Sequence, residues 1–389
     1  MDVREIRQQI PVCQRMVYLN TGWSGPSPVS VVDAIKRRLD VEMIGGPASP
    51  EVAESGREVR TAARQAVAGL LNASPDEVCL TKNTTDGLNM VMNGLSWQPG
   101  DEIVSCDLEH SSVLVPSYFK QLRNGAALKV VHLEPNEPRE NILAKLEDAL
   151  TERTRLVFLS HIEYSSGLRQ PVEEIRRITK GRGIMMLLDG AQTAGHIRLN
   201  MKEIDCDFYS IPGQKWLLGS EGVGALYIRQ GMISQVEPTA VSGGAVLPHD
   251  LPDQFEPNTE SMDKFNVSSS SAALQAGLEE AIRFIQSVGV DVIEQRNLDL
   301  ASSLKEALAE IPGVSVLSPM ERDISSGLVS FSIDGVEPAD VVSFLWAEHR
   351  IAARRVAYPP GVRASLHFFN TEEEVERLAA AVRERAEGS

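Results

Sequence analysis

The most informative residue of the chain is Lys215, which stands in the turn Ser210-Ile-Pro-Gly-Gln-Lys-Trp-Leu-Leu-Gly219 between two apolar segments. A lysine held in a dry pocket has a lowered pKa and can form a Schiff base with a carbonyl cofactor. A lone lysine in a turn is more commonly an exposed residue without chemistry. The choice between these interpretations depends on what the rest of the chain places near Lys215.

Asp189 is the first such neighbour, because it closes the apolar run Ile184-Met-Met-Leu-Leu-Asp189, a pattern typical of a buried strand. A buried carboxylate needs a cationic partner, since an unpaired charge in the interior is costly. A pyridinium nitrogen would be such a partner, and a protonated ring is the electron sink that pyridoxal phosphate chemistry requires. The dipeptide Asp189-Gly190 is equally typical of a plain turn.

A third candidate is the segment Thr81-Lys-Asn-Thr-Thr-Asp-Gly87, which lies between an expected strand and an expected helix. The free backbone N–H groups at the start of such a helix, with the hydroxyls of Thr84 and Thr85, could hold a phosphate. The same residues also form an ordinary helix N-cap. Both interpretations stay open at this point.

The elements that must position these residues alternate along the first two thirds of the chain. Short β-rich runs are expected as strands at residues 78–81, 102–106, 156–160, 184–188, 207–210 and 223–228. Segments of helical period are expected as helices at residues 51–71, 86–95, 112–123, 140–150 and 172–179. This alternation is the pattern of βαβ units and predicts a large, doubly wound α/β domain with a mostly parallel sheet.

The last third of the chain has a different organisation. Residues 241–258 are rich in Gly, Pro and Asp, a composition typical of a linker. Beyond them we expect helices at 272–286, 291–310, 339–349 and 372–387, and strands at 328–333 and 364–369. We therefore predict a large cofactor-binding domain of residues 16–260 and a smaller C-terminal α+β domain of residues 261–389, with residues 1–15 packing near the small domain.

Composition excludes several classes of function. The 389 residues carry 54 acidic and 38 basic side chains, a net charge of −16 that repels nucleic-acid backbones and anionic membrane surfaces. We see neither a membrane-spanning run nor a secretory signal, so we expect a cytoplasmic protein that binds neither nucleic acid nor membrane. The four cysteines are far apart and form no CxxC pair, which argues against a disulfide framework and against a metal site.

Motifs along nearly the whole chain resemble one known family. They are Tyr18-Leu-Asn-Thr-Gly22, Asn83-Thr-Thr-Asp-Gly87, Glu109-His-Ser-Ser112, Asp189-Gly-Ala-Gln192, Gly213-Gln-Lys-Trp216, and Arg363-Ala-Ser-Leu with Asn370-Thr-Glu-Glu-Glu374. Their order and spacing resemble the class V aminotransferase and cysteine desulfurase group of fold-type I pyridoxal phosphate enzymes. The resemblance implies the fold-type I fold, pyridoxal 5'-phosphate as cofactor, an amino-acid substrate, and a homodimer with a shared active site.

The resemblance also implies roles around the cofactor ring. Lys215 resembles the lysine that holds the cofactor as an aldimine, and Asp189 resembles the partner of the pyridine nitrogen. His110 matches the imidazole that stacks on the ring and, with Lys215 and Asp189, completes the expected catalytic set. Gln192 resembles the hydrogen-bond donor to the ring hydroxyl oxygen.

Further residues match the ends of the site. Thr84 and Thr85 match the phosphate cradle of the family. Arg363 resembles the arginine that binds the substrate carboxylate through a bidentate pair, a geometry that lysine cannot supply. Asn20 and Gly22, from the first motif, are expected substrate contacts.

Several positions depart from the family pattern. Gln214 replaces the histidine that usually precedes the lysine and contacts the phosphate, and it is still expected to bind the cofactor because its amide can donate a hydrogen bond. Pro212 replaces a serine or threonine that contacts the phosphate, and it has neither hydroxyl nor N–H. Ser210 and Ser269 are therefore expected to complete the phosphate site, and Ser269 matches a hydroxyl that reaches the phosphate of the neighbouring subunit in relatives. Tyr164 replaces an asparagine of the desulfurases and is an expected substrate contact.

The departure that matters most concerns sulfur. Desulfurases pass sulfur to a cysteine thiolate on a loop before the carboxylate-binding arginine, but this chain has no cysteine after Cys206, and residues 352–362 lack one. The leading hypothesis is a carbon–sulfur β-lyase that uses Lys215 as base on cysteine, cystine or a cysteine conjugate and gives pyruvate, ammonia and a thiol or persulfide. A class V aminotransferase or an amino-acid epimerase is the alternative, ahead of a cysteine desulfurase or a catalytically inactive regulatory protein.

Overall fold

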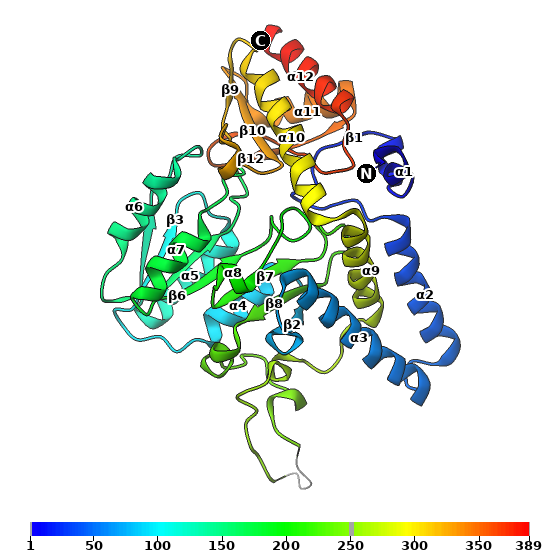
Figure 1. Cartoon of the computed structure of the whole chain (residues 1–389), viewed down its shortest axis with the longest axis vertical. Helices are drawn as coiled ribbons and strands as arrows, with labels where there is room; N and C mark the ends of the chain where they lie inside the picture. Colours follow the sequence, from blue (N-terminus) through cyan, green and yellow to red (C-terminus); the bar gives the residue numbers. More distant parts are fainter. Residues whose placement is uncertain (1, 249–252, 389) are drawn as a thin grey trace.

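The computed structural model describes residues 2–248 and 253–388. A seven-stranded sheet of order β2-β8-β7-β6-β5-β3-β4 forms its centre (Figure 1). The strands are β2 (Val78–Thr81), β3 (Glu102–Cys106), β4 (Ala127–Val131), β5 (Thr154–Ser160), β6 (Met185–Asp189), β7 (Phe208–Pro212) and β8 (Gly224–Ile228). β8 runs antiparallel to both of its neighbours, whereas the other pairs are parallel. The expected mostly parallel sheet is confirmed.

Helices cover both faces of this sheet because its strands are apolar on both sides. Along β5, Leu156 and Phe158 belong to one core, whereas Val157 and Leu159 belong to the other. The first core includes residues of α4 (Thr84–Gly94) and α5 (Ser111–Asn124); the second includes residues of α3 (Pro50–Leu71), α6 (Arg139–Ala149), α7 (Val172–Gly181) and the short α8 (Met201–Ile204). This arrangement confirms the doubly wound α/β architecture.

The C-terminal part forms a smaller α+β unit, at the top of Figure 1. Its antiparallel sheet has the order β12-β13-β10-β9. The elements are β9 (Val314–Val316), β10 (Leu328–Ile333), β12 (Arg354–Val356), β13 (Gly361–Ser365), α10 (Val290–Ala309), α11 (Pro338–His349) and α12 (Glu372–Glu387). Leu304, Leu345 and Leu378, one from each helix, pack with the sheet in a third core.

The N-terminal segment links the two units. After α1 (Val3–Gln8), β1 (Val17–Tyr18) pairs in parallel with β11 (Ile351–Ala352) of the C-terminal part. α2 (Val29–Gly45) and α3 pack against α9 (Ala272–Val288), which follows the expected boundary at residue 260. That boundary stays a prediction, and residues 249–252 of the expected linker lie outside the described residues.

One predicted strand was misplaced and several elements were missed. The expected strand at 364–369 ends at Ser365, because residues beyond it turn: Asn370 accepts from His367 N through Oδ1 at 2.8 Å. Arg363 therefore lies inside β13 rather than at its start. The longest elements that the sequence did not predict are α2 and β4, and the short elements α1, β1, α8, β9, β11 and β12 were missed as well.

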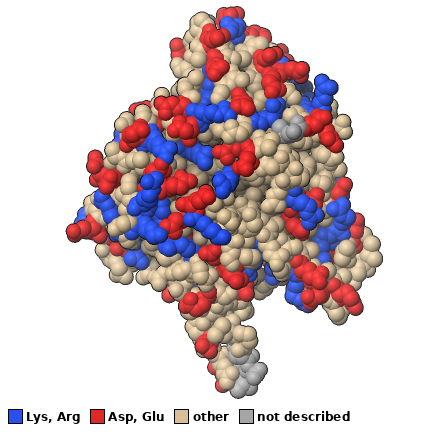
Figure 2. All heavy atoms as spheres, in the orientation of Figure 1, with Lys and Arg blue, Asp and Glu red and all other residues tan. Residues whose placement is uncertain are grey.

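Charged side chains of both signs intermix on the face seen in Figure 2. Around α7, for example, Lys180 pairs with Asp205 at 2.6 Å and Arg182 pairs with Glu147 at 2.7 Å. No helix in the described part of the chain is long and apolar enough to cross a membrane.

Candidate active site

The expected site residues meet at the carboxyl ends of the parallel strands. Asp189 is the last residue of β6, Lys215 follows β7, and His110 follows β3 as the N-cap of α5. Arg363 comes from β13 of the C-terminal unit and donates to the carbonyl of Tyr164, which follows β5, at 2.6 Å. Both units therefore build the site, at the sheet edge where ligands bind in open α/β folds.

Lys215 has the electrostatic surroundings of a reactive amine. Burial lowers the pKa of its ammonium to about 8, and the nearby Arg363 and Arg354 act in the same direction, whereas Asp189 opposes them. A lysine with such a pKa is partly neutral near neutral pH, and the neutral amine is the nucleophilic form. The alternative of an ordinary exposed turn lysine does not fit these surroundings.

The turn that carries Lys215 is tightly fixed. Gly25 N donates to Gln214 O at 2.6 Å, and a Cβ built at Gly25 would come within 2.1 Å of Lys215 O, so only glycine permits this approach. Leu218, whose N–H donates to Lys215 O at 3.0 Å, has a φ of +61°. A non-glycine residue rarely adopts this left-handed conformation, which persists only where the surrounding packing imposes it.

Asp189 is buried and lacks a counterion. Its Oδ1 accepts from Ala191 N at 2.7 Å. Burial raises the pKa of its carboxyl, while Lys215 acts in the opposite direction. No ion pair to Asp189 forms among the described residues, so a protonated ring nitrogen could supply the missing cation.

His110 is held as a neutral ring. Its Nδ1 accepts from Ser112 N at 3.1 Å and lies 2.9 Å from Ser112 Oγ, which in turn lies 2.7 Å from Thr85 Oγ1. Burial, assisted by Lys215 and Arg354, lowers the pKa of His110 to about 4. The Tyr164 ring meets His110 edge-on, with centroids 5.0 Å apart.

Some of the residues expected to bind phosphate have side-chain atoms without a hydrogen-bond partner among the described residues, whereas others already form hydrogen bonds within the chain. Thr84 lies in the first turn of α4, and its buried Oγ1 has no partner in the described structure, like Gln214 Oε1. Ser210 Oγ instead donates to Thr84 O at 2.9 Å, so its proton fixes the start of α4. Ser269 is exposed and lines a cleft of about 860 Å³ with Asn83 of the same chain.

Gln192 connects the first motif to the site. Its Nε2 donates to Gly22 O at 2.9 Å, and its Oε1 accepts from Trp216 Nε1 at 2.8 Å. A Cβ at Gly22 would meet Gln192 Oε1 at 3.0 Å, which explains the glycine at this close approach. Asn20 Oδ1 is buried without a partner among the described residues.

Arg363 is a buried cation with free hydrogen-bonding capacity. It is 0% exposed, and beyond the bond to Tyr164 O its Nε and Nη2 have no partner in the described structure. Burial, with the nearby Arg354, lowers the pKa of its guanidinium to about 9. Two unpaired donors on one guanidinium are what a carboxylate oxygen pair would satisfy.

Arg354 is a site residue that the sequence reasoning missed. It stands opposite Arg363 in the pairing of β12 with β13, and its guanidinium lies 4.7 Å from the centre of the Trp23 ring. No carboxylate pairs with it in the part of the chain that the structure describes. The sequence feature that could have identified Arg354 is the pair of arginines at the two ends of the 354–363 hairpin. Together with Lys215, these arginines give the site an excess of positive charge.

Pyridoxal phosphate fits the residues present. Asp189 lacks a cation and would pair with the ring nitrogen, while the Lys215 amine would meet the aldehyde carbon. The unpartnered hydroxyl of Thr84 and the N-terminus of α4 would hold the phosphate.

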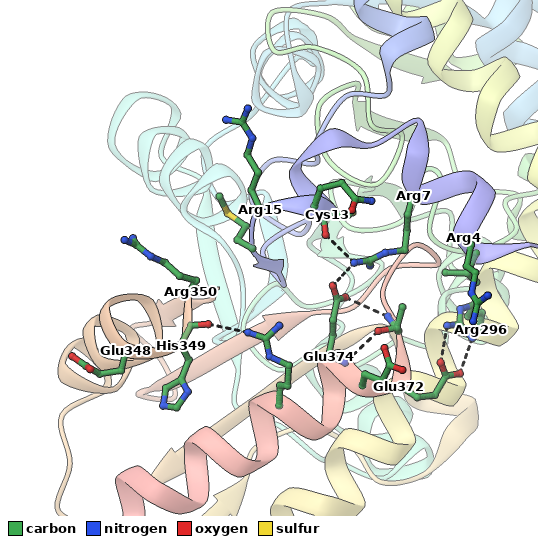
Figure 3. A pocket seen from close by; sticks show the side chains of 16 residues that line it. Arg4, Arg7, Cys13, Arg15, Arg296, Glu348, His349, Arg350, Glu372 and Glu374 are labelled. Carbon is green, nitrogen blue, oxygen red and sulfur yellow. Dashed lines mark hydrogen bonds and ion pairs between the residues drawn. The ribbon is translucent and has the colours of Figure 1, made fainter.

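A separate cleft of about 800 Å³ lies between α1 and α12 (Figure 3). Two of its arginines pair with glutamates of the cleft: Arg7 with Glu374 at 2.8 Å and Arg296 with Glu372 at 2.9 Å. None of the expected site residues lines it. We interpret this cleft as the joint between the N-terminal segment and the C-terminal unit.

The fold and site together define a pyridoxal-phosphate-dependent enzyme of the doubly wound α/β class. The chain belongs to the class V aminotransferase family, whose pattern it matches over residues 17–378.

Similar proteins agree with this assignment. The chain is 30% identical to a probable cysteine desulfurase of Methanothermobacter thermautotrophicus, covering 99% of this chain and 98% of the relative. It is 31% identical to the isopenicillin N epimerase of Streptomyces clavuligerus, covering 98% of each. The solved structure of the cystine C–S lyase C-DES with its product cysteine persulfide superposes with a TM-score of 0.90 at 29% identity, over 96% of this chain and 99% of that one. These findings confirm the family, the fold and the cofactor.

Proposed function

We propose that this enzyme is a carbon–sulfur β-lyase that acts on cystine or a related cysteine derivative. The observation that carries the proposal is the state of its cysteines, because a desulfurase needs a thiolate to receive sulfur. All four cysteines are buried and free. Burial raises the pKa of Cys13 to about 11 and that of Cys79 to about 12, and it also raises the pKa of Cys106 and Cys206.

The hairpin before Arg363 supports the same conclusion. β12 and β13 are joined by a short turn, and residues 352–362 contain no cysteine. A β-elimination needs no enzyme thiol, since the sulfur leaves with the electrons of the broken carbon–sulfur bond. Cystine and water would give cysteine persulfide, pyruvate and ammonia.

The chain's own residues have separate tasks in this reaction. Bound pyridoxal phosphate supplies the electron sink for the bonds at the substrate α-carbon. Arg363 binds the α-carboxylate through Nε and Nη2, and the Lys215 amine removes the α-proton. Asp189 would keep the ring nitrogen of the bound cofactor protonated, and His110, whose lowered pKa keeps it neutral, would pack against the cofactor ring.

Arg354 favours a substrate with a second carboxylate. Its guanidinium is held against Trp23 and has no acidic partner among the described residues, so a distal carboxylate like that of cystine would complete its pairing. Cysteine has no such group. We therefore expect cystine to be a better substrate than cysteine.

We also propose that the enzyme is a homodimer with a shared active site, in which Ser269 reaches the partner's phosphate. Large apolar side chains are exposed on α2 and α5, among them Met43, Ile44 and Leu122, each at least 75% exposed. A second copy would cover such surfaces. Light scattering on the purified protein tests this, and a monomer that is fully active would contradict it.

Product analysis tests the proposed reaction. The enzyme, loaded with pyridoxal phosphate, is incubated with cystine, and pyruvate, persulfide, alanine, new keto acids and D-amino acids are measured. We expect pyruvate and persulfide in equal amounts. Alanine would indicate desulfuration, a keto acid without pyruvate would indicate transamination, and a D-amino acid would indicate epimerisation; each of these as the main product would contradict the proposal.

A further inference from the structure

Two buried glutamates lie directly behind the active site. Glu109 follows β3, and Glu163 follows β5; they are 5% and 0% exposed. Cys106 Sγ lies 3.8 Å from Glu109 Oε1 and 3.4 Å from Glu163 Oε1. One thiol thus contacts both carboxyl groups in the interior of the protein.

This cluster contains no cation. Among the described residues neither Glu109 nor Glu163 forms an ion pair, and Glu163 Oε2 is buried without a partner. Glu102, at the other end of β3, is equally buried but pairs with Lys129 at 2.9 Å and Arg153 at 3.0 Å. Two buried carboxylates without a counterion are too costly to persist, so the Glu109 and Glu163 pair must be neutralised in another way.

Protons are the simplest way. Burial raises the pKa of Glu163 to about 7, and Asp189 and Asp107 act in the same direction, against hydrogen bonds from Gln170 and Cys106. Burial and the neighbouring Glu163 likewise raise the pKa of Glu109, against the hydrogen bonds from Ser160. The groups that face the pair thus include two further acids, and the balance favours protonation near neutral pH.

Glu109 supports the part of the site that holds the cofactor ring. Its carboxyl accepts from Ser160 N at 2.6 Å and from Ser160 Oγ at 2.5 Å. Ser160 pairs with Asp189 between β5 and β6, and His110 is the residue that follows Glu109. The carboxyl therefore fixes the strand end beside Asp189 and the backbone before His110.

Glu163 supports the part that binds the substrate carboxylate. Its Oε1 accepts from Gln170 Nε2 at 3.0 Å. This hydrogen bond connects the beginning of the turn after β5 to the end of the same turn, just before α7. Tyr164, the next residue, accepts from Arg363 through its carbonyl and meets His110 through its ring. A displacement of Glu163 would therefore move both Arg363 and the contact to His110.

We propose that Glu109 and Glu163 are positioning residues. This pair, kept protonated around Cys106, holds the segments of His110 and Tyr164 together. The positions of His110, Asp189 and Arg363 relative to one another are thereby fixed. The proposal rests on the roles given to His110, Asp189 and Arg363 in the proposed function. Ionisation of the pair would place two like charges within 4.8 Å of each other and push the two segments apart.

Thermal unfolding against pH tests the protonation without any turnover. A pKa raised in the folded state gives stability that is present at low pH and is lost as the pH rises through about 7. Wild-type protein should therefore lose melting temperature between about pH 4.5, the ordinary pKa of a glutamate, and about pH 7 relative to Glu163→Gln, whose amide stays neutral. Parallel curves for the two proteins would overturn the proposal.

Glu102→Gln is the matched control at the other end of β3. Although burial alone would raise the pKa of Glu102, hydrogen bonds from Thr151 and Lys129 lower it to about 2, so this carboxylate stays ionised over the whole range. Its replacement should lower the melting temperature by a similar amount at each pH. If the melting temperature of Glu102→Gln followed the same pH trend as that of Glu163→Gln, the trend would result from the loss of any buried carboxyl group. That outcome would contradict the proposed protonation of Glu163.

Kinetics test the positioning role. Glu163→Ala should lower kcat/KM by about tenfold to a hundredfold, with a higher KM because Arg363 is displaced, whereas Glu163→Gln should restore most of the activity near neutral pH. The alkaline fall in kcat/KM that starts near the pKa of Glu163 should be weaker in Glu163→Gln. Equal activities in Glu163→Ala and wild type, or no rescue by glutamine, would overturn the proposal.

Two further outcomes are separable. Stoichiometric metal in the purified holoenzyme would mean that a cation, not a proton, neutralises Cys106, Glu109 and Glu163, whose ligand atoms lie within 4.8 Å of one another, and would overturn the proposal. Failure of the wild type to form pyruvate from cystine would remove the proposed function instead. The unfolding curves would still decide whether the pair is protonated.

Discussion

Buried charged residues at the amino edge of the seven-stranded sheet, where its parallel strands begin, have partners of opposite charge, whereas those at the carboxyl edge, where the strands end, lack such partners among the described residues. At the amino edge, Asp207 accepts from Met186 N at 2.8 Å and pairs with Arg176 at 3.0 Å and with Arg229. At the carboxyl edge, Asp189 lacks a counterion, and Arg363 has unpartnered nitrogens within the described structure. Both sets of charges are buried, so burial alone does not distinguish them.

The difference separates charges that hold the fold from charges that bind ligands. A buried ion network is stable when each member finds its partner within the chain. An unpaired buried charge is costly, and here the cofactor and the substrate would supply the partners. Incomplete pairing therefore identifies the functional edge more sharply than the depth of burial does.

The largest effect is expected from Lys215→Ala. Without the amine, neither the proton transfer at the substrate α-carbon nor the covalent attachment of the cofactor can occur, so turnover should fall by at least about a thousandfold. Absorbance and borohydride trapping of the purified variant measure the attachment. Wild-type rates without added amines would refute the assignment of Lys215.

Arg363→Met should separate activity from stability. The variant should lose about a hundredfold or more in kcat/KM, mainly through KM, because the substrate carboxylate loses its paired donors. Its melting temperature should stay level or rise, since an unpaired buried charge is replaced by an apolar chain of similar length. A large loss of melting temperature would mean that the charge of Arg363 stabilises the fold rather than binding a ligand.

Asp207→Asn should show the opposite behaviour. Arg176 would be left buried without its carboxylate, which should cost about 3–5 kcal/mol of the free energy of unfolding. Activity per folded molecule should be nearly unchanged at low temperature, because Asp207 is remote from the carboxyl edge. Urea unfolding followed by circular dichroism, beside initial rates, checks both parts; a drop in rate without loss of stability would contradict the comparison.

The smallest effect is expected from replacing Cys13, Cys79 and Cys206 by serine or alanine together with Cys106 by serine, whose hydroxyl keeps a hydrogen-bond donor between Glu109 and Glu163. Pyruvate formation should continue if the fold survives, because no enzyme thiol takes part in elimination. Packing losses at the buried positions should lower stability modestly. Alanine in place of pyruvate in the wild type, together with a persulfide on one cysteine by mass spectrometry, would restore the desulfurase interpretation.

The parts of the fold that the sequence predicted share one physical property. The strands of the central sheet are apolar on both faces, so their short apolar runs were easy to find. β4 was missed because it is an edge strand whose residues are exposed or half-buried, and α2 was missed because Leu39, Met43 and Ile44 make its outward face apolar as well.

The site was predictable in a similarly uneven way. Lys215, Asp189 and His110 carry chemistry in their residue types and motifs, and the fold brings them to one edge. Arg354 and Glu163 look ordinary in the sequence, because what distinguishes them is that neither has an oppositely charged partner among the described residues, a property of three-dimensional packing.

The parallel pairing of β1 with β11 has a consequence for biosynthesis. β1 is synthesised long before β11, its partner strand, because most of the large sheet lies between them in the sequence. The segment that follows β1 carries Gly22 and Gly25, which contact Gln192 and the turn of Lys215. Because domains fold as units during synthesis, we expect the large sheet to form first and this segment to pack over the lysine only after β11 has been made. The nascent enzyme would thus present an open site to its cofactor before the pairing of β1 with β11 closes it.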